Sequence, residues 1–434
     1  MTGVFLLIAG NLLFPFIAAG YLVYFFLTPR RGLLGRLASE LAQRFVCYGG
    51  AADLPVRPVW IHAASVGEVK SISGLTAALK EKYPGRAILL TTSTAAGRAE
   101  ARKNPCISKA VLAPLDFYPL VTRFIKLFKP SSLILIETEL WPNMLTACRM
   151  AGVETCIING RLSAKSLFTY SLVKPMMRLA FKGVRTACLQ TEEIAARYEK
   201  LGLPKNRITV TGNIKYDRLD ESATRTAQVA ALTDALGWTG KKILVCGSTH
   251  PAEEELLART FAEISDTIHD YRVIAAPRHL ERAEQVCSIF RKAGLATARL
   301  TQRDAQALQP AAGTQVLVAD TMGWLTSFYG AGTACFVGGT IAPRGGHNLL
   351  EAAIAGKPVL FGPHTGNTPE TAAKLAANGG GLPVTVENFA SSLIQLLNKP
   401  GRIAELGRRA RETALSYKGA TNRTLDALPD SLFK

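Results

Sequence analysis

The chain has 434 residues, of which 48% are hydrophobic, so it is long enough for two domains with buried cores and too apolar for a disordered chain. Its 51 Lys and Arg outnumber its 33 Asp and Glu. The excess lies in the first half, because residues 28–220 hold 29 basic and 14 acidic side chains, whereas residues 221–434 hold 22 and 19. We therefore expect the first half to face an anionic partner such as a membrane surface, a phosphorylated substrate or a nucleic acid.

The first predicted element is an uncharged, mostly apolar run over residues 3–27. About 20 apolar residues in a helix span the core of a bilayer, so a membrane anchor is expected over residues 1–28. Four arginines between residues 30 and 44 favour a cytoplasmic location for the rest of the chain. A cleaved signal peptide is the alternative, but it would carry a basic start that is absent here. Asn11 and Pro15 also allow a helix that lies in the membrane interface.

Short β-rich runs then alternate with helix-length stretches. The predicted strands cover residues 59–64, 87–92, 132–138, 154–160, 186–190 and 208–213 in the first half, and 242–248, 272–278, 316–320, 334–339 and 358–363 in the second. Apolar strands separated by helices indicate parallel sheets covered on both faces. The sequence predicts an α/β protein of two Rossmann-like domains, residues 29–220 and 221–400, facing one cleft. Residues 401–434, with a helix near 402–416, are expected to pack back on the first domain.

Three charged residues of the first half follow strand ends, where parallel sheets bind ligands. Glu68 begins a helix, where a carboxylate is ordinarily only a partner for the helix dipole, but its place at the expected cleft suits a general base. Glu137 ends a buried strand face and needs a ligand or a cation such as Lys215, because an unpaired buried carboxylate is costly. Glu139 is either an ordinary helix-start acid or, with Glu137, a metal pair. A dedicated metal site is not expected, since no Asp-x-Asp or helical His pair accompanies them.

The second half holds four such loops, at residues 247–255, 276–279, 319–324 and 338–348. Backbone N–H groups of the first loop are expected to point at the cleft, although no Gly-Lys-Ser/Thr follows as in a P-loop. Arg278 can bind a phosphate through two N–H groups. Gly345 and Gly346 allow close approach of an anion to a helix N-terminus. Asn348 and Glu351 lie on one face of that helix, where the carboxylate can accept both hydroxyl protons of a ribose.

These motifs together resemble one family, the 3-deoxy-D-manno-octulosonic acid (Kdo) transferases. The matching blocks are HAASVGE, IETELWPN, NGRLSAKS, TGNIKYD, GSTHPAEEE, APRH, DTMG and VGGTIAPRGGHNLLEAAIAGKPVLFGPHTGN. The resemblance covers nearly the whole chain after the anchor. It implies the GT-B fold and inverting transfer of Kdo from CMP-Kdo to a lipid A precursor (lipid IVA), with no cofactor and no required metal. It also implies a bacterial inner-membrane protein, single-pass or monotopic, with cytoplasmic catalytic domains in contact with anionic lipid.

The resemblance also implies roles for individual residues. Glu68 corresponds to the proton acceptor, and Glu137 and Lys215 to residues that support the transition state. The implied CMP site consists of Pro277, Arg278, Met322, Gly323, Trp324, Asn348, Leu349, Leu350 and Glu351. Further candidates in the donor loops are Thr249, His279, Gly345 and Gly346. Trp324 stands where the family usually has Glu, so we expect either a backbone contact there or stacking of the indole on the nucleotide.

There are two alternatives, one in the same fold class and one in another functional class. Another GT-B enzyme that uses a UDP-sugar would have similar loops in its second half. A non-catalytic, membrane-tethered protein that binds RNA or anionic lipid would explain the positive charge without Glu68. The sequence lacks the basic and aromatic interleaving of single-strand binders, so a nucleic-acid partner is not expected.

Overall fold

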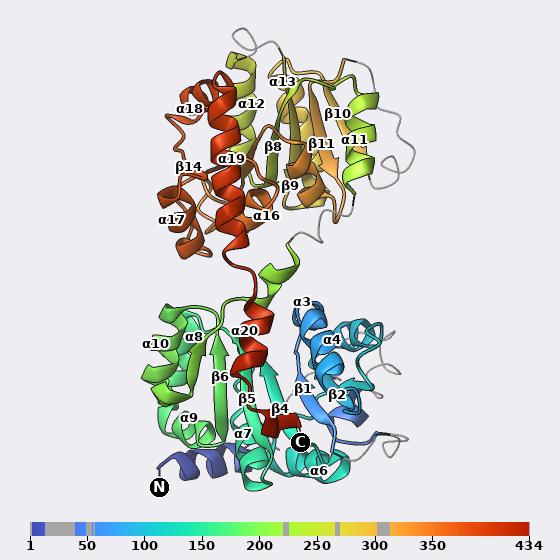
Figure 1. Ribbon diagram of the computed structural model, residues 1–434, viewed down its shortest axis with the longest axis vertical. Coiled ribbons are helices and arrows are strands. Elements are labelled where there is room, and N and C mark those ends of the chain that lie inside the picture. Colours follow the sequence, from blue (N-terminus) through green and yellow to red (C-terminus); the bar gives the residue numbers. More distant parts are fainter. Residues whose placement is uncertain are drawn as a thin grey trace. The chain divides into compact units, whose positions relative to one another are not determined.

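The computed structural model describes residues 2–13, 40–48, 54, 57–219, 225–264, 270–301 and 313–433. The chain forms two compact units, Met1–Asp217 with Gly419–Lys434, and Arg218–Lys418. Each unit contains one seven-stranded sheet with helices packed on its faces (Figure 1). Part of the predicted anchor and the expected boundary near residue 220 lie outside the described residues.

The sheet of the first unit has the strand order β3-β2-β1-β4-β5-β6-β7, and neighbouring strands are parallel. Its strands are β1 (Val59–His62), β2 (Ile88–Thr92), β3 (Lys109–Leu112), β4 (Ser132–Ile136), β5 (Glu154–Gly160), β6 (Val184–Leu189) and β7 (Ile208–Val210). The order reverses between β1 and β4, which are hydrogen-bonded neighbours. Ligands of open α/β sheets bind beyond the carboxyl ends of strands at such a switch point.

The central strands of this sheet are buried on both faces because both faces carry packed helices. Trp60 and Leu133 belong to one apolar cluster, whereas Ile61 and Ile134, the next residues along the same strands, belong to another. Successive side chains of a strand point to opposite faces. Every residue of β1 and β4 is buried, which explains why these strands read as continuous apolar runs.

The helices of the first unit follow the strands in βα alternation. They are α3 (Val66–Ser71), α4 (Ser73–Lys82), α5 (Ala95–Ala101), α6 (Tyr118–Phe128), α7 (Pro142–Met150), α8 (Ala164–Leu172), α9 (Lys174–Phe181), α10 (Glu192–Leu201) and α20 (Ala420–Ala427), with 3-10 turns η1 (Lys205–Arg207), η2 (Ile214–Arg218) and η5 (Asp430–Phe433). A further helix covers residues 2–13. Among the described residues, no helix has both the length and the apolarity needed to cross a bilayer.

The helix over residues 2–13 is fixed to the first unit at both ends, by Asn11 and Gly3. Asn11 Nδ2 donates to Asn143 Oδ1 at 2.7 Å, and Asn11 Oδ1 accepts from the backbone N–H of Tyr118 at 2.9 Å. At the other end Gly3 packs so closely on α9 that a Cβ would lie 2.4 Å from the carbonyl oxygen of Pro175. Both contacts hold the helix beside α6, α7 and α9.

The end of the chain is divided between the two units. α19 (Pro400–Leu415) packs on α16, α17 and α18 of the second unit, whereas α20 and η5 pack in the first. Leu432 and Phe433 join an apolar cluster of the first unit, and the Leu432 carbonyl accepts a hydrogen bond of 2.7 Å from Ser132 Oγ. The predicted segment 401–434 is therefore not one structural piece, because the helix expected near 402–416 stays with the second unit.

The sheet of the second unit has the order β10-β11-β9-β8-β12-β13-β14, again with parallel neighbours. Its strands are β8 (Lys242–Thr249), β9 (Tyr271–Pro277), β10 (Thr297–Thr301), β11 (Val316–Asp320), β12 (Ala334–Val337), β13 (Val359–Phe361) and β14 (Gly381–Pro383). The switch point of this sheet lies between β8 and β12, which pair directly.

The helices of the second unit pack on both faces of this sheet. They are α11 (Thr226–Ala235), α12 (Glu253–Ile264), α13 (Ala283–Lys292), α15 (Leu325–Ala331), α16 (Leu349–Ala353), α17 (Pro369–Ala377), α18 (Phe389–Leu397) and α19, with the 3-10 turn η4 (Leu280–Arg282). Core side chains such as Leu244, Val273 and Phe336 are at most 1% exposed. The α/β fold with two parallel-sheet units is thus confirmed, and each of the eleven predicted strand runs overlaps an observed strand.

Candidate functional site

Glu68 lies at the switch point of the first unit, directly after β1. Ser65 is the N-cap of α3, and its hydroxyl accepts from the backbone N–H of Glu68 at 3.3 Å. The Glu68 carboxylate in turn accepts from the Ser65 hydroxyl at 2.9 Å and from the backbone N–H of Ala64 at 2.8 Å. This reciprocal arrangement is a variant of the capping box in which the acid accepts from the N–H before the N-cap. It explains the local fold and holds the carboxylate in one orientation.

Glu137 follows the neighbouring strand β4 and has a strained backbone. Its φ is 60°, a left-handed conformation that few residues other than glycine adopt. Strain of this kind persists where surrounding contacts enforce it, and it is concentrated at functional sites. The Glu137 Oε1 atom lies 2.6 Å from Lys215 Nζ, which η2 brings to the end of the sheet. The cation that Glu137 requires is therefore the one that the sequence suggested.

The loop after β4 also carries Glu139, which the sequence left open as a helix-start acid or a metal ligand. Its Oε2 accepts from the Trp141 indole N–H at 2.6 Å and lies 3.6 Å from His62 Nε2. Burial raises the pKa of Glu139, but His62 and Trp141 outweigh burial and leave the pKa below its usual value. His62 ends β1 and was missed from the sequence, where a buried histidine in a strand gives no functional signal.

These residues form an acid cluster, defined here as Glu68, Glu137 and Glu139 with their partners Lys215 and His62. The pKa of Glu68 is raised, first by burial and further by the negative charges of Glu137 and Glu139, against the lowering effect of its own hydrogen bonds. A carboxylate with a raised pKa is a stronger base than a free one. Among the described residues, no group of three or more His, Cys, Asp or Glu side chains could hold a metal ion.

The second unit places several predicted residues after β9 and at α16. Pro277 ends β9, and the Arg278 and His279 side chains that follow are exposed. Asn348 is the N-cap of α16, and its Nδ2 donates to Glu351 Oε1 at 3.1 Å. Burial raises the pKa of Glu351, and its hydrogen bond from Asn348 and the charge of Arg278 lower it. Arg278, Asn348 and Glu351 are thereby brought together as the sequence predicted.

Other predicted positions in this unit are less accessible. The side chains of Thr249, Leu349 and Leu350 are fully buried, so these positions can offer a ligand only their backbone. Met322 is 76% exposed and is followed by Gly323, whose φ is 76°. These two residues fit a loop that is open to a ligand.

Trp324 is only 1% exposed. Its indole stacks on Phe328, with ring centroids 5.8 Å apart, and the Arg225 guanidinium lies 4.8 Å from the indole centroid. The indole is part of the core and is not available to stack on a nucleotide. Of the two expectations for this position, only the backbone contact is compatible with the structure.

The sequence analysis expected backbone N–H groups of residues 247–255 to point at the cleft, but the N–H of His250 points at a carboxylate of its own loop. The loop positions Glu253, which is 0% exposed, and its carboxylate accepts five backbone N–H groups. The donors are His250, Gly339, Thr340, Ile341 and Ala342, at 2.9–3.1 Å. Successive N–H groups in such a loop form an anion-binding concavity, and here the protein's own carboxylate fills it.

The glycine pair is also less available than expected. Gly345 and Gly346 do adopt positive φ values of 82° and 77°. However, the Gly346 N–H donates to the Gly339 carbonyl at 2.7 Å, and α16 has only five residues. The Gly346 N–H is therefore already engaged, and a helix as short as α16 has only a weak dipole.

Two histidines that the sequence analysis did not select lie at the switch point of this sheet. His250 follows β8, and His347 precedes α16. Their Nε2 atoms are 2.8 Å apart, and Arg278, His279 and Arg344 act on them electrostatically. We refer to these five side chains as the basic cluster. The only sequence signal for the pair was the occurrence of each histidine inside a glycine- or serine-containing loop after a strand.

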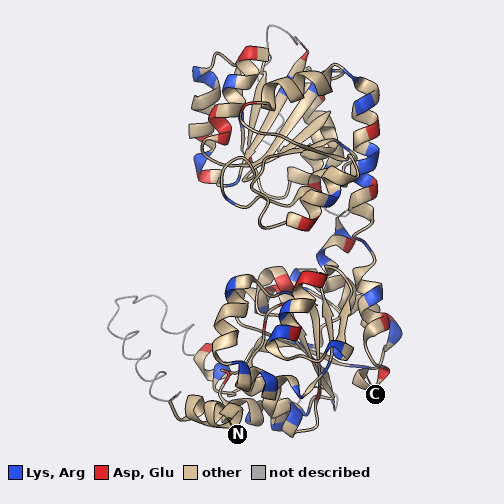
Figure 2. Cartoon of the chain, turned by 90° about the vertical axis from the view of Figure 1, so that its left-hand side faces the viewer, with Lys and Arg blue, Asp and Glu red and all other residues tan. Residues whose placement is uncertain are grey.

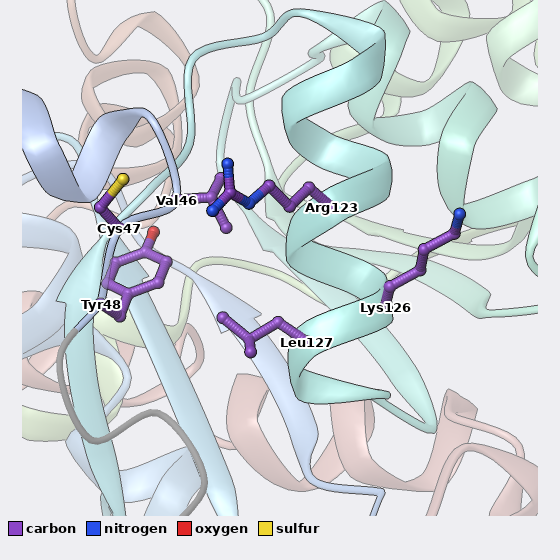
Figure 3. Close-up of a pocket in the computed structure, with 6 residues that line it drawn as sticks. All are labelled: Val46, Cys47, Tyr48, Arg123, Lys126 and Leu127. Atoms are coloured by element: carbon purple, nitrogen blue, oxygen red, sulfur yellow. The ribbon is translucent and has the colours of Figure 1, made fainter.

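A separate pocket of about 590 Å³ lies elsewhere on the first unit. Figure 3 shows its lining residues Val46, Cys47, Tyr48, Arg123, Lys126 and Leu127. Three of them come from α6. This helix runs antiparallel to the strands, so its C-terminal end lies near the amino ends of the strands, whereas the acid cluster lies at their carboxyl ends. This pocket is therefore not part of the candidate catalytic site.

Comparison with solved structures shows that two such units form a GT-B-like fold. The chain is similar to the UDP-GlcNAc 2-epimerase of Neisseria meningitidis bound to UDP-GlcNAc, with 14% identity and a TM-score of 0.59 over 85% of this chain and 99% of the other. A glycosyltransferase from Rickettsia africae gives 14% identity and a TM-score of 0.58 over 86% and 98%. At this identity the likeness defines the fold class and nothing more.

Sequence comparison identifies the family. The family model of 3-deoxy-D-manno-octulosonic-acid transferase (kdotransferase) matches residues 39–218. The 3-deoxy-D-manno-octulosonic acid transferase of Bordetella pertussis is 35% identical over 90% of this chain and 91% of its own length. The enzyme of the same name from Haemophilus influenzae is 32% identical over 91% of both. The chain belongs to the 3-deoxy-D-manno-octulosonic acid transferase family and is a glycosyltransferase.

Proposed function

We propose that the protein transfers Kdo from CMP-Kdo to a hydroxyl group of a lipid A precursor, with inversion at the anomeric carbon. The observation that carries this proposal is Glu68, a fixed carboxylate with a raised pKa at the switch point of the first unit. A sugar hydroxyl is a poor nucleophile until a base accepts its proton during attack. The bond from the acceptor oxygen to the anomeric carbon forms as the bond to the CMP phosphate breaks, and Glu68 takes the proton.

Glu137 and Lys215 are proposed to support the transition state. The anomeric carbon carries positive charge as the leaving phosphate departs, because glycosyl transfer passes through an oxocarbenium-like state. Glu137 is held at one position by its ion pair with Lys215. Fixed charges act more strongly on a developing charge than solvent does, because they do not need to reorganise.

The donor is proposed to bind to the second unit. Asn348 and Glu351 would hold the ribose of CMP, and Arg278 the phosphate. Pro277, Met322 and Gly323 are exposed or at a strand end and are proposed to contact the base and ribose. Backbone groups at Trp324, Leu349 and Leu350 complete the proposed site, since their side chains are buried.

The acceptor side is proposed to lie against an anionic membrane. In the helix over residues 2–13, Phe5, Leu12 and Leu13 are 58–69% exposed. Figure 2 shows Lys and Arg on the helices beside it. One of these helices, α6, contacts Asn11 through Tyr118 and carries Arg123 and Lys126. Apolar side chains next to basic ones suit the interface of a bilayer containing anionic lipid. We propose a cytoplasmic enzyme held at the inner membrane by its N-terminal segment.

The test is a product analysis. Purified full-length protein is incubated with CMP-Kdo and a tetraacylated lipid A precursor, and the product is weighed by mass spectrometry. A mass increase of one or more Kdo residues is expected, with release of CMP. The proposal would be contradicted if the acceptor stayed unchanged while a reference enzyme modified it in a parallel reaction.

A competition experiment addresses the two alternative functions. CMP is expected to inhibit transfer at lower concentration than UDP, whereas a UDP-sugar enzyme would show the reverse. A non-catalytic binding protein would bind polyanions in a salt-sensitive manner and would be indifferent to replacement of Glu68.

A further inference from the structure

The histidine pair at the switch point of the second unit can hold only one proton between its rings. His250 Nε2 and His347 Nε2 are 2.8 Å apart, and the ring planes differ by only 2°. At this distance one nitrogen must donate and the other accept, because two N–H groups cannot point at each other. The pair is therefore at least partly neutral as it stands.

The surroundings of the pair carry positive charge from two loops. Arg278 and His279 follow β9, Arg344 precedes His347, and the pKa of His347 is lowered to about 4, first by burial and then by the positive charges of His250, Arg278 and His279. Burial and the charge of Arg344 also lower the pKa of His250.

The carboxylates near this basic cluster are already engaged. Glu254 is 0% exposed and forms two hydrogen bonds of 3.0 Å with Arg282. Glu253 is taken up by its five backbone donors, and Glu351 is bonded to Asn348. His279 forms an exposed ion-pair contact of 3.6 Å with Glu281. Within the described residues, no carboxylate lies in ion-pair distance of Arg278 or Arg344.

Several backbone N–H groups at this place are already used within the protein, so the exposed side chains are the main additional donors for an anion. The N–H groups of residues 339–342 go to Glu253, and that of Gly346 goes to Gly339. Exposed side chains of Arg278 and Arg344 remain, and guanidinium groups suit planar anionic oxygen groups. A proton added to His347 would break the shared contact with His250 and leave an imidazolium N–H free to donate.

We propose that Arg344 and His347 join Arg278 in a subsite for an anionic oxygen group of the donor, with His250 as the positioning residue of His347. Binding of the anion is linked to uptake of a proton by the histidine pair, since an anion compensates the charge that otherwise disfavours protonation. This inference rests on the proposed function for the identity of the donor. CMP-Kdo offers two such groups, the phosphate and the carboxylate of the sugar acid.

The first experiment measures binding to the full-length protein by isothermal titration calorimetry. The ligands are CMP, free Kdo and cytidine, and the variants are Arg344→Gln, His347→Gln and the control Lys292→Gln. Lys292 is exposed at the C-terminal end of α13, near the amino ends of the strands and away from the basic cluster. Its replacement removes one positive charge, as Arg344→Gln does. We expect Arg344→Gln and His347→Gln to weaken anion binding roughly tenfold and to leave cytidine binding unchanged.

The ligands distinguish the two sources of the anionic group. Weaker binding of CMP identifies the phosphate as the bound group. Unchanged CMP binding with weaker binding of Kdo, or a raised KM for CMP-Kdo, identifies the sugar carboxylate. If both variants match Lys292→Gln for CMP, Kdo and CMP-Kdo, the subsite does not exist.

The second experiment tests the positioning role of His250 by its pH profile. Titrations at pH 6.0 and 7.5, in buffers of different ionisation enthalpy, report protons taken up on binding. The wild type is expected to take up more protons than His347→Gln or His250→Gln, because phosphate protonation is common to all three. Equal proton uptake would overturn the linkage. A wild-type protein that binds CMP but does not transfer Kdo would refute the proposed function. The CMP titrations of the variants would still test the subsite in that case.

Discussion

The two units place opposite charges at equivalent points of similar sheets. In the first unit the loops after β1 and β4 carry the three carboxylates of the acid cluster. In the second, the loops after β8 and β12 carry the histidines and Arg344 of the basic cluster. The net charges run the other way, since the first half is strongly basic and the second nearly balanced. The overall charge of a domain therefore describes the partners of its surface, while the charge of its site depends on a few side chains at the switch point.

Backbone strain marks both switch points. Glu137 in the first unit and Ser248 in the second have φ values of 60° and 56°. The two units use their buried acids differently. Burial raises the pKa of Glu68 and the neighbouring acids raise it further, whereas the Glu253 carboxylate accepts hydrogen bonds from backbone N–H groups. One carboxylate is arranged for proton transfer and the other for holding loops in place.

The strongest test of this difference is Glu68→Gln. The amide keeps the shape of the capping box but cannot accept a proton, so transfer is expected to fall by roughly 10²- to 10⁴-fold. CMP binding should be unchanged, because the proposed donor residues belong to the other unit. Transfer rates and CMP titrations of the same preparation check this. Glu81→Gln, an exposed change on α4, is the control, and near-normal transfer by Glu68→Gln would remove Glu68 from the role of base.

Glu253→Gln tests the structural acid. One carboxylate oxygen becomes an amide nitrogen that faces backbone N–H groups, so stability is expected to fall by about 3–5 kcal/mol. Urea unfolding of the full chain measures the loss. The slope of the unfolding free energy against urea concentration should be the same in variant and wild type. The matched control is Glu263→Gln, an exposed position on the same helix. A loss below that of ordinary surface substitutions would show that the five hydrogen bonds do not organise the loop.

Glu137→Gln tests the acid cluster through the pH dependence of transfer. Removing one negative charge lowers the raised pKa of Glu68, so the acidic limb of the kcat/KM profile is expected to move to lower pH. The rate on the plateau should fall about tenfold because a fixed charge at the transition state is lost. Glu139→Gln is expected to shift the limb in the same direction while leaving the Lys215 ion pair intact. An unmoved limb in both variants would mean that Glu68 is not the titrating group.

The smallest expected effect is the contribution of His347 to the pH dependence of folding stability. Its pKa is lowered from the usual 6.5 to about 4 in the folded state, so the unfolded chain binds more protons between these values. This group therefore contributes stability above pH 6.5 that is lost as the pH falls toward 4. His347→Gln should make the midpoint of thermal unfolding less sensitive to pH in this window than it is in the wild type. A steeper dependence in the variant would contradict the lowered pKa.

Much of the fold could be predicted because the central strands are buried on both faces. The three strands that the sequence analysis missed are β3, β10 and β14, and all three lie at sheet edges. Edge strands are partly exposed and have less need of continuous apolar side chains. In β10, for example, Arg299 is exposed and Leu300 is the one buried residue of the strand. The apolar signal that identified β1 and β4 is therefore weak in these strands.

The candidate site was predictable where chemistry follows from one strand end, as for Glu68, Glu137 and Arg278. It was not predictable where two distant loops combine, as for His250 and His347, which are 97 positions apart. Glu253 shows the same limit, because in the sequence it is one of three consecutive acids at a helix start. Only the contacts with residues 339–342 reveal that this carboxylate occupies the anion position of the loop.

The sequence by itself determined the alternation of strands and helices and the positions of charged residues at strand ends, because burial on two faces and turn chemistry are local properties. The tertiary structure decided which of those charges are free. Pairing of β1 with β4 and of β8 with β12 brings together loops that are far apart along the chain, and hydrogen bonding within those loops then engages some polar groups and leaves others available to a ligand.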